Sequence, residues 1–464
     1  MNFSTYQTDI FAAFDEGKSL RVDAVAGSGK TTVLVELAKR CEKGKLNIFL
    51  AFNNSIADEL GQKLPYWVQS STFHSYCWSA VKQAFPGIKL AKKKTDDIYS
   101  ELADSDQAFY KNIQSVKKLV GLMKGSSMSG QELIDYHDIE CEDADVLAMI
   151  ARKVLEVSNS DVSCADFDDM LYFATRPEVN FVQADAIFVD EAQDLNEIQR
   201  ELLFKMLKRD GRLIIVGDPH QSIYGFRGAD VDSMDELATR FELETLPLSV
   251  SYRCSTSVVD AARRFVPHIL ARDGAPSGCV RTTPLDFSAF PDGCGVLCRN
   301  TAPVIQLALK LLKHGRPTKV LGRDIGAGLK RTVKAFKATD MNELRQRLRS
   351  WRDREVAKCE KKHQRGKAAT IEDKFSALTY IIEDCVSVSS VETKIDFLFR
   401  ETSASITCST VHKAKGLEYD TVFILNRNLM PSKYAEQEWQ IRQEKNIEYV
   451  AITRAKENLY YINL

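Results

Sequence analysis

Short apolar runs alternate with segments of helical periodicity through the first half of the chain. The runs that have the length and composition of buried strands lie at 20–25, 47–52, 184–191, 212–218 and 243–248. Between them, stretches such as V-L-V-E-L-A-K-R repeat apolar residues at helical spacing. Strands that alternate with helices in this way predict a parallel, doubly wound α/β sheet.

A second α/β unit is predicted to begin near Pro247. Its expected strands lie at 294–298, 318–322, 405–410, 420–425 and 459–463. Two helix-prone segments, 85–163 and 335–398, lack strand signals and are interpreted as helical insertions. The resulting division is 1–84 with 164–246 as the first α/β domain, 85–163 as its insertion, 247–334 with 399–464 as the second α/β domain, and 335–398 as a reduced second insertion.

The stretch 345–367 within the second insertion holds ten Lys or Arg against three acids. Such a run is typical of a solvated helix face, which we favour, and a nucleic-acid or partner contact is the alternative. Both interpretations stay open at this point.

Composition narrows the class of protein without deciding its partner. The chain has 464 residues, 44% hydrophobic and 27% charged, which is typical of a globular protein of two to four domains. A net charge of −1 neither supports nor excludes nucleic acid, because a binder of that charge concentrates its positive charge locally. No apolar run of about 18 residues and no signal-peptide pattern is present, so we expect a cytoplasmic protein of a bacterial or phage-infected cell. Eleven scattered cysteines suggest reduced thiols, and the pair Cys294 and Cys298 lacks further ligands at metal-site spacing.

The stretch A-V-A-G-S-G-K-T (24–31) departs from the G-x-x-x-x-G-K-[ST] phosphate-binding pattern only at Ala24. A glycine loop that opens a helix directs backbone N–H groups at phosphate oxygens. Lys30 would reach the β- and γ-phosphates of ATP, and the Thr31 hydroxyl would hold Mg²⁺. The residues expected around the phosphates are Ala26, Gly27, Ser28, Gly29, Lys30, Thr31 and Thr32. A chance glycine turn is the alternative, but a strand before the loop and a helix after it argue against that.

Two adjacent acids follow the apolar run 184–189, in F-V-D-E-A-Q-D. Asp190 at a strand end is placed to hold Mg²⁺, and Glu191 can orient and deprotonate an attacking water. Taken alone, the two adjacent acids could equally be ordinary surface residues. The phosphate-binding loop upstream makes phosphoanhydride hydrolysis the firmest chemical prediction.

The stretch G-D-P-H-Q-S-I-Y-G-F-R-G-A-D (217–230) places a glutamine and then aromatic rings directly after a third strand. With these motifs the chain resembles the superfamily 1 helicases of the UvrD/Rep/PcrA group. The resemblance also rests on F-N-N-S-I-A, S-T-F-H-S, D-F-D-D-M-L, S-Y-R-C-S, T-V-H-K-A-K-G-L-E-Y-D and E-Y-V-A-I-T-R-A, in family order from residue 22 to 455. F-N-N-S-I-A leans toward the F-box-helicase-like and phage-encoded branches.

The resemblance implies two RecA-like domains with ATP held between them. Gln7 would read the adenine edge, Tyr252 would stack on adenine, and Glu418 would contact the ribose. Gln221 would sense the γ-phosphate, and the arginines Arg253 and Arg454 would reach it from the second domain. Hydrolysis would then open and close the cleft between the domains, as a motor requires.

The resemblance also implies a track for single-stranded DNA, in which rings stack on bases regardless of sequence. The residues expected to contact DNA are Phe52, Asn53, Thr72, His74, Tyr224, Phe226, Arg227 and His412. Phe52, His74 and His412 have ordinary core residues as their alternative. The acids of 166–171 are expected to organise loops and not to touch DNA.

We therefore predict an ATP- and Mg²⁺-dependent translocase on single-stranded DNA and a 3′-to-5′ helicase that opens 3′-tailed duplexes in repair, replication or recombination. The short second insertion weakens the prediction of unwinding more than that of translocation. Alternatives are a helicase subunit of a nuclease-coupled antiphage system, and a translocase that strips proteins from DNA. The chain ends nine residues after Ala455, so any partner nuclease or loading factor is expected to be a separate chain. We expect a monomer in solution and no membrane association.

Overall fold

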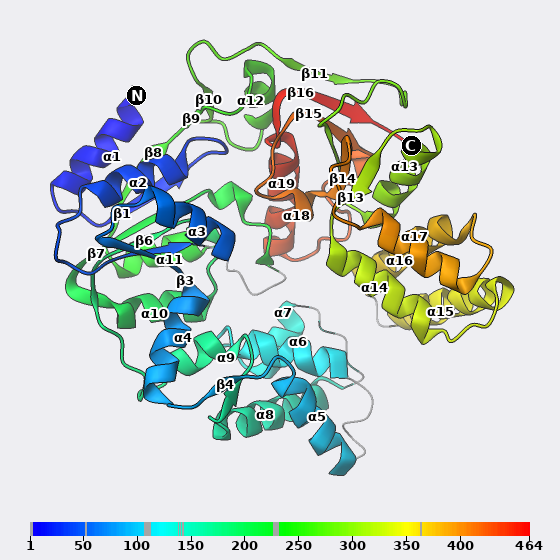
Figure 1. The fold of residues 1–464 in the computed structure, drawn as a ribbon, viewed down its shortest axis with the longest axis horizontal. Coiled ribbons are helices and arrows are strands. Elements are labelled where there is room, and N and C mark those ends of the chain that lie inside the picture. Colours follow the sequence, from blue (N-terminus) through cyan, green and yellow to red (C-terminus); the bar gives the residue numbers. More distant parts are fainter. Residues whose placement is uncertain are drawn as a thin grey trace. The chain divides into compact units, whose positions relative to one another are not determined.

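The polypeptide folds into two α/β units, drawn in Figure 1 with colours that follow the sequence. This computed structural model describes residues 3–51, 53–105, 113–137, 139, 141, 143–225, 232–361 and 364–464. Unit 1 comprises Met1–Ala24 and Gly29–Ser249, and unit 2 comprises Val25–Ser28 and Val250–Leu464. In the part of the chain that is described, none of the helices is both long enough and apolar enough to cross a membrane.

A parallel sheet of six strands forms the centre of unit 1. In spatial order its strands are β3 (Val68–Thr72), β2 (Asn47–Ala51), β6 (Ala184–Val189), β7 (Leu207–Gly217), β1 (Leu20–Ala24) and β8 (Glu244–Leu248). Alternate residues of β6 enter different cores: Phe188 joins one apolar cluster, whereas Ile187 joins the other. Both faces of the sheet are therefore buried, which is why its strands read as continuous apolar runs.

Helices cover both faces of this sheet. They are α1 (Thr5–Asp15), α2 (Lys30–Lys39), α3 (Asn54–Lys63), α4 (Phe73–Ala84), α9 (Asp169–Tyr172), α10 (Glu197–Met206) and α11 (Ser233–Arg240). Residues of α1 and α2 such as Phe14 and Leu34 pack on the Phe188 side, and residues of α4 and α10 such as Val81 and Leu203 pack on the Ile187 side. Short 3₁₀ turns follow several strands, at Phe173–Thr175, Ala192–Asp194 and Pro219–Gln221.

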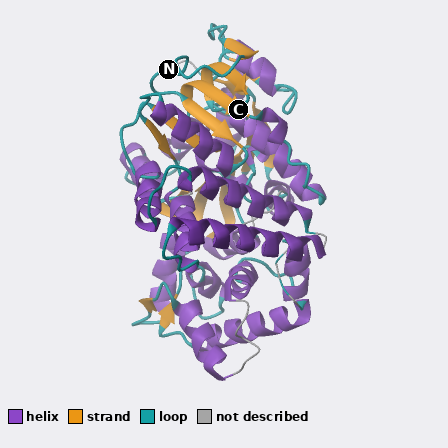
Figure 2. Ribbon diagram, turned by 90° about the vertical axis from the view of Figure 1, so that its right-hand side faces the viewer, coloured by secondary structure: helices purple, strands orange, loops and turns teal. Residues whose placement is uncertain are grey.

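A helical insertion interrupts unit 1 between the two short paired strands β4 (Lys89–Leu90) and β5 (Cys164–Ala165). Its helices are α5 (Lys94–Ser105), α6 (Ile113–Met123), α7 (Gly130–Tyr136) and α8 (Ala144–Ser160). Helix α6 buries Val116, Leu119 and Val120 against α8, and these residues belong to an apolar cluster separate from the two cores of the sheet. In Figure 2 this insertion is nearly all helix.

Unit 2 is built on a second parallel sheet of six strands. In spatial order they are β11 (Cys279–Thr282), β16 (Ala455–Ile462), β15 (Tyr419–Leu425), β12 (Gly295–Cys298), β14 (Ile406–Thr410) and β13 (Thr318–Val320). A smaller parallel pair joins β9 (Val250–Ser251) to β10 (Leu270–Ala271). The helices are α12 (Thr256–Ala262), α13 (Thr301–Lys313), α14 (Arg323–Ala335), α15 (Met341–Lys361), α16 (Arg365–Ile382), α17 (Val388–Leu398), α18 (Val411–Ala414) and α19 (Glu438–Ile452), with a 3₁₀ turn at Arg427–Leu429.

The second helix-rich segment, α14 to α17, does not have a core of its own. Leu348 of α15 and Leu378 of α16 belong to the same buried cluster as Val296 of β12 and Ile305 of α13. The segment therefore packs as an extension of the α/β core of unit 2.

The predicted fold class, α/β with doubly wound parallel sheets and helical insertions, is confirmed. Each predicted strand corresponds to an observed one, but strands β3 and β11 and the short pairs β4–β5 and β9–β10 were missed. β11 has only partly buried or exposed residues, so it carries no apolar run to mark it. The four-part division of the chain stays a prediction.

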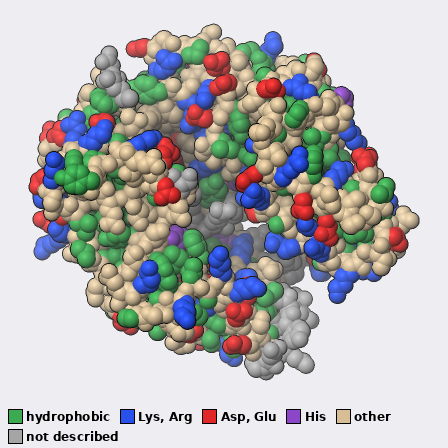
Figure 3. All heavy atoms as spheres, viewed as in Figure 1, with side chains coloured by type: hydrophobic (Ala, Val, Ile, Leu, Met, Phe, Trp, Pro, Cys, Tyr) green, Lys and Arg blue, Asp and Glu red, His purple; other side chains and the backbone are tan. Residues whose placement is uncertain are grey.

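The basic stretch 345–367 lies on α15 and the start of α16. Several of its cations pair with nearby acids, for example Arg347 with Glu343 and Lys358 with Glu355. Figure 3 shows basic and acidic side chains interspersed over the visible face. These pairs favour a solvated face for that part of α15.

Candidate active site

The three sequence motifs expected to handle phosphate follow three neighbouring strands of unit 1. The glycine loop follows β1, Asp190 and Glu191 follow β6, and Asp218 follows β7, in a sheet where the order is β6-β7-β1. Because the strands are parallel, their carboxyl ends lie at one edge of the sheet. Ligands of doubly wound α/β domains bind at this edge.

The glycine loop turns sharply before α2 begins at Lys30. Gly27 and Gly29 have φ angles of +74° and +84°, a left-handed conformation that residues with a Cβ adopt at a cost. The Ser28 hydroxyl is buried and has no hydrogen-bond partner among the described residues. An orphaned hydroxyl at a helix N-terminus is suited to an added acceptor such as a phosphate oxygen.

Lys30 lies among carboxylates. Its ammonium is 2.9 Å from Glu191 Oε1. Burial disfavours the charge on Lys30, but Glu191, Asp190 and Asp218 outweigh it, so the pKa of Lys30 is raised. Lys30 therefore stays charged and partly neutralises an acidic pocket.

The Thr31 hydroxyl lies 3.3 Å from Asp190 Oδ2, to which it donates a hydrogen bond. Burial, together with the neighbouring Glu191, raises the pKa of Asp190 to about 6. A hydroxyl and a carboxylate side by side are oxygen ligands that Mg²⁺ accepts, and Mg²⁺ commonly completes its shell with phosphate oxygens and water. Thr31 and Asp190 therefore fit the Mg²⁺ that the sequence implies.

Gln193 connects two of the strand ends. Its Nε2 donates to Glu191 Oε2 at 2.6 Å, and its Oε1 accepts from the backbone N–H of Asp218 at 3.0 Å. Asp218 Oδ2 in turn accepts from Gln221 Nε2 at 2.7 Å. The predicted γ-phosphate sensor Gln221 is thus joined to Glu191 through Asp218 and Gln193, neither of which sequence reasoning had singled out.

Glu191 itself is held in a strained backbone conformation. Its φ of +52° is left-handed, which costs a non-glycine residue about 1–3 kcal/mol. Its backbone N–H donates to Asp190 Oδ1 at 2.8 Å. The two acids are therefore fixed relative to each other by local bonds as well as by the strand.

The turn Val25–Ser28 makes its described contacts within unit 2. The Ala26 N–H donates to the Tyr449 hydroxyl at 3.0 Å, and the Ala26 carbonyl accepts from Ser251 Oγ at 2.8 Å. The backbone N–H of Tyr252 donates to the Gly27 carbonyl at 2.9 Å. Tyr449 was missed, although it stands inside the quoted stretch E-Y-V-A-I-T-R-A.

Gln7 lies beside the glycine loop. It is only 5% exposed, its Oε1 accepts from the Ser4 N–H at 3.0 Å, and its Nε2 lies 3.9 Å from where a Cβ on Gly29 would stand. Thr32 contacts the same point from the first turn of α2. The position of Gln7 is suitable for a base next to the phosphates, and its role in adenine recognition stays a prediction.

The predicted arginines of unit 2 lie on neighbouring loops. Arg253 pairs with Glu418 at 2.6 Å, and Lys456 lies 3.3 Å from the same carboxylate. Burial opposes ionisation, but these cations lower the pKa of Glu418. Arg454 is 1% exposed, and its guanidinium donates to the carbonyls of Val450 and Leu417. Their reach to a γ-phosphate stays a prediction, as does stacking by the partly exposed Tyr252.

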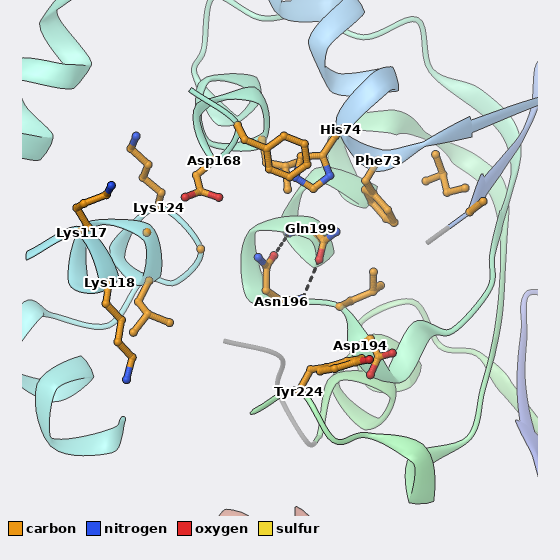
Figure 4. A pocket seen from close by; sticks show the side chains of 18 of the residues that line it. Phe73, His74, Lys117, Lys118, Lys124, Asp168, Asp194, Asn196, Gln199 and Tyr224 are labelled. Atoms are coloured by element: carbon orange, nitrogen blue, oxygen red, sulfur yellow. Dashed lines mark hydrogen bonds between the residues drawn. The ribbon is translucent and has the colours of Figure 1, made fainter. Parts of the chain in front are cut away.

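A cavity of about 620 Å³ lies within unit 1, beside the carboxyl ends of β2 and β6. Figure 4 shows His74 and Phe73 on one side, Asp194 and Tyr224 on another, and Lys117 and Lys118 of α6 across from them, with Asp168 between the lysines and His74. His74 stacks on Phe167 with ring centroids 4.0 Å apart. Burial lowers the pKa of His74 to about 4, so the imidazole is neutral at pH 7. Rings and ammonium groups around one cavity match the needs of single-stranded nucleic acid.

Two of the predicted DNA contacts, His74 and Tyr224, line this cavity. Asn53 and Thr72 instead cap helices: Asn53 Oδ1 accepts from the Ile56 N–H, and Thr72 Oγ1 accepts from the Ser75 N–H. His412 lies on α18 in unit 2. Phe52, Phe226 and Arg227 lie outside the described residues. Sequence reasoning missed Phe167, Lys117 and Lys118.

Two of the acids of 166–171, Asp166 and Asp169, organise a loop as expected, whereas Asp168 lines the cavity. Asp166 and Asp169 pair with the buried ammonium of Lys124 at 2.9 and 2.7 Å, and Asp169 also lies 3.2 Å from that of Lys94. Separating these buried ion pairs would leave Lys124 or Lys94 as an uncompensated buried charge, which is costly. The pairs therefore hold the loop of Asp166 and Asp169 in place.

Comparisons with known proteins agree with this site. The family model described as the UvrD/REP helicase N-terminal domain matches residues 5–242, and that of the UvrD-like helicase C-terminal domain matches residues 329–464. F-box DNA helicase protein 1 of Schizosaccharomyces pombe is 24% identical over 504 aligned residues, covering 96% of this chain and 55% of that protein. F-box DNA helicase 1 of Gallus gallus is 25% identical, covering 96% and 47%. ATP-dependent DNA helicase UvrD1 of Mycobacterium tuberculosis is 28% identical over 299 aligned residues, covering 55% and 38%. The chain spans about half the length of the F-box relatives.

Proposed function

Because the chain belongs to the UvrD/Rep family of superfamily 1 helicases, we propose that it is an ATP-dependent motor that moves along single-stranded DNA. The observation that carries this proposal is the arrangement at three adjacent strand ends. There Lys30 contacts Glu191, Thr31 contacts Asp190, and Gln193 links Glu191 toward Gln221.

Hydrolysis follows from the properties of these side chains. Lys30 would exchange its contact with Glu191 for phosphate oxygens, which frees the Glu191 carboxylate to orient and deprotonate a water. Thr31 and Asp190 would hold Mg²⁺, which supplies positive charge to the phosphates. Gln221 would respond to loss of the γ-phosphate through its bond to Asp218.

DNA is the proposed polymer because the relatives are named DNA helicases. The stacked pair His74–Phe167 and the ring of Tyr224 offer faces to bases, and each base stacked on an aromatic ring contributes about 1–3 kcal/mol. Lys118 offers charge to phosphates from the opposite wall, and Lys117 beside it pairs with Asp96 at 2.5 Å. By resemblance the motor moves 3′ to 5′ and serves DNA repair, replication or recombination.

A second candidate is a translocase that removes bound proteins from DNA without opening the duplex. The observation that favours it is the packing of α14 to α17 onto the core of unit 2, because this segment is short and is not a lobe with a core of its own.

Strand separation with tailed duplexes tests the proposal. Duplexes with identical sequence and either a 3′ or a 5′ single-stranded tail are mixed with protein, ATP and Mg²⁺, and release of a labelled strand is followed. The helicase proposal predicts release from the 3′-tailed duplex alone. Removal of streptavidin from biotinylated single strands without duplex opening would favour the second candidate. The absence of both strand separation and streptavidin removal would contradict both candidates.

A further inference from the structure

The loop between α6 and α7 is held at four successive residues by other parts of unit 1. Lys124 pairs with Asp166 and Asp169, and the Gly125 carbonyl accepts from the Ile198 N–H at 3.4 Å. The Glu197 carboxylate then accepts from both Ser126 Oγ and the Ser127 N–H, each at 2.9 Å. The loop is therefore attached to the first turn of α10.

This attachment joins two functional walls. On one side the loop continues from α6, which carries Lys117 and Lys118 along the cavity. On the other side α10 begins directly after the segment 192–196, which follows Glu191. Asn196 at this junction lines the cavity and caps α10 through its bond with the Gln199 N–H, marked in Figure 4.

The contact is close and charged. A Cβ placed on Gly125 would come within 3.2 Å of Asn196 Nδ2, so the loop lies directly against the start of α10. Burial opposes ionisation of Glu197, but the Ser127 and Ser126 donors and nearby Arg200 lower its pKa, so the carboxylate stays charged. Hydrogen bonds to an ionised acceptor are about twice as strong as neutral ones. Closely packed protein interiors have low compressibility and transmit strain. A shift of the loop that carries Ser126 and Ser127 would therefore be passed on to the start of α10.

We propose that Glu197 is a positioning residue that couples the lysine-bearing wall of the cavity to the catalytic strand end, so that single-stranded DNA in the cavity accelerates turnover at Glu191. The inference rests on the proposed function and adds the route by which DNA regulates hydrolysis. Glu197 contacts neither the cavity nor the phosphate site; it acts through Ser126, Ser127 and the segment 192–196.

The test compares Glu197→Gln with Glu201→Gln in steady-state ATP hydrolysis, with and without saturating single-stranded DNA. Glu201 is a matched control, because it is a partly exposed acid one turn further along α10 that pairs with Arg240. We expect basal hydrolysis and the KM for ATP of both variants to equal those of the unmodified protein. DNA stimulation should fall by about fivefold or more in Glu197→Gln only, the range of a typical coupling free energy.

A second variant separates coupling from damage to the fold. Ser126→Ala removes one donor and leaves the Ser127 N–H, so it should lose part of the stimulation. The double variant should lose no more than Glu197→Gln alone, because both changes break one contact. Strictly additive losses, or full stimulation in Glu197→Gln, would overturn the inference while leaving the proposed function intact. Absence of DNA stimulation in the unmodified protein would instead overturn the proposed function itself.

Discussion

At the scale of single residues, the site depends on side chains that connect motifs to one another. Gln193 is 1% exposed and bonds Glu191 with its amide nitrogen and Asp218 with its amide oxygen. Its backbone carbonyl also accepts from Ser222 Oγ at 3.3 Å. One buried amide therefore links Glu191, the proposed base for the attacking water, to the loop that carries Gln221.

We expect Gln193→Ala to slow ATP hydrolysis by about tenfold or more, because Glu191 loses a donor and the Asp218 N–H is left buried without its acceptor, at a cost of about 1–3 kcal/mol. Steady-state hydrolysis and thermal unfolding measure the two effects. Gln131→Ala is the control, since Gln131 lies at the exposed start of α7. Unchanged turnover in Gln193→Ala would show that the bridge is dispensable.

His74 makes a prediction about pH. Burial lowers its pKa to about 4 in the folded chain, whereas the unfolded chain has a pKa near 6.5. Its contribution to the free energy of unfolding is therefore complete above pH 6.5 and is lost as the pH falls from 6.5 toward 4, because the unfolded state binds the proton first. Denaturant unfolding of His74→Phe, compared with the unmodified protein, should be less sensitive to pH in this window. Parallel pH profiles would contradict the neutral, stacked imidazole.

At the scale of elements, the strand ends and α6 contribute to different parts of the proposed site. Strands β1, β6 and β7 bring the phosphate chemistry to one edge, and α6 brings cations to the cavity beside it. Helix α6 is amphipathic: Val116, Leu119 and Val120 face the core of the insertion, while Lys117 and Lys118 face the cavity.

The charge on α6 should be visible in the salt dependence of binding. We expect Lys118→Ala to weaken binding of single-stranded oligonucleotides of any sequence and to reduce the slope of log K against log salt by about 0.7 to 1, as for one lost phosphate contact. Fluorescence anisotropy at several salt concentrations measures it. Lys82→Ala on α4 is the matched control, being an exposed lysine that does not line the cavity. Equal slopes in all three proteins would exclude Lys118 from the DNA contact.

The sequence was most informative where polar motif residues directly follow the apolar run of a buried strand. Lys30, Asp190 and Gln221 could be placed because a motif directly after a buried strand is carried to the edge of the sheet whatever the loops do. Phe167, Tyr449 and Glu197 could not, because their roles depend on which loop packs against which helix. Asn53 and Thr72 show what residue type alone leaves open. Both are predicted DNA contacts, and the structure shows their side chains as N-caps, a use that their residue types equally favour, so their contact with DNA stays a prediction.

At the scale of the whole molecule, each unit has its own parallel sheet and its own share of the expected nucleotide contacts. Unit 1 holds Lys30, Asp190 and Glu191, and unit 2 holds Arg253, Glu418 and Arg454. The proposed motor requires that hydrolysis depend on DNA, and unit 1 contains both the proposed phosphate site and the cavity proposed to hold the strand. Dependence of hydrolysis on DNA is therefore the central claim.

The most direct test measures steady-state ATP hydrolysis with and without single-stranded DNA, for the unmodified protein and for Lys30→Ala. Lys30→Ala should fold, because the buried residues of α2, among them Val33, Leu34 and Leu37, are unchanged. We predict strong stimulation of the unmodified protein by DNA, and no hydrolysis by Lys30→Ala in either condition. A hydrolysis rate that DNA leaves unchanged, or one that survives the loss of Lys30, would contradict the account.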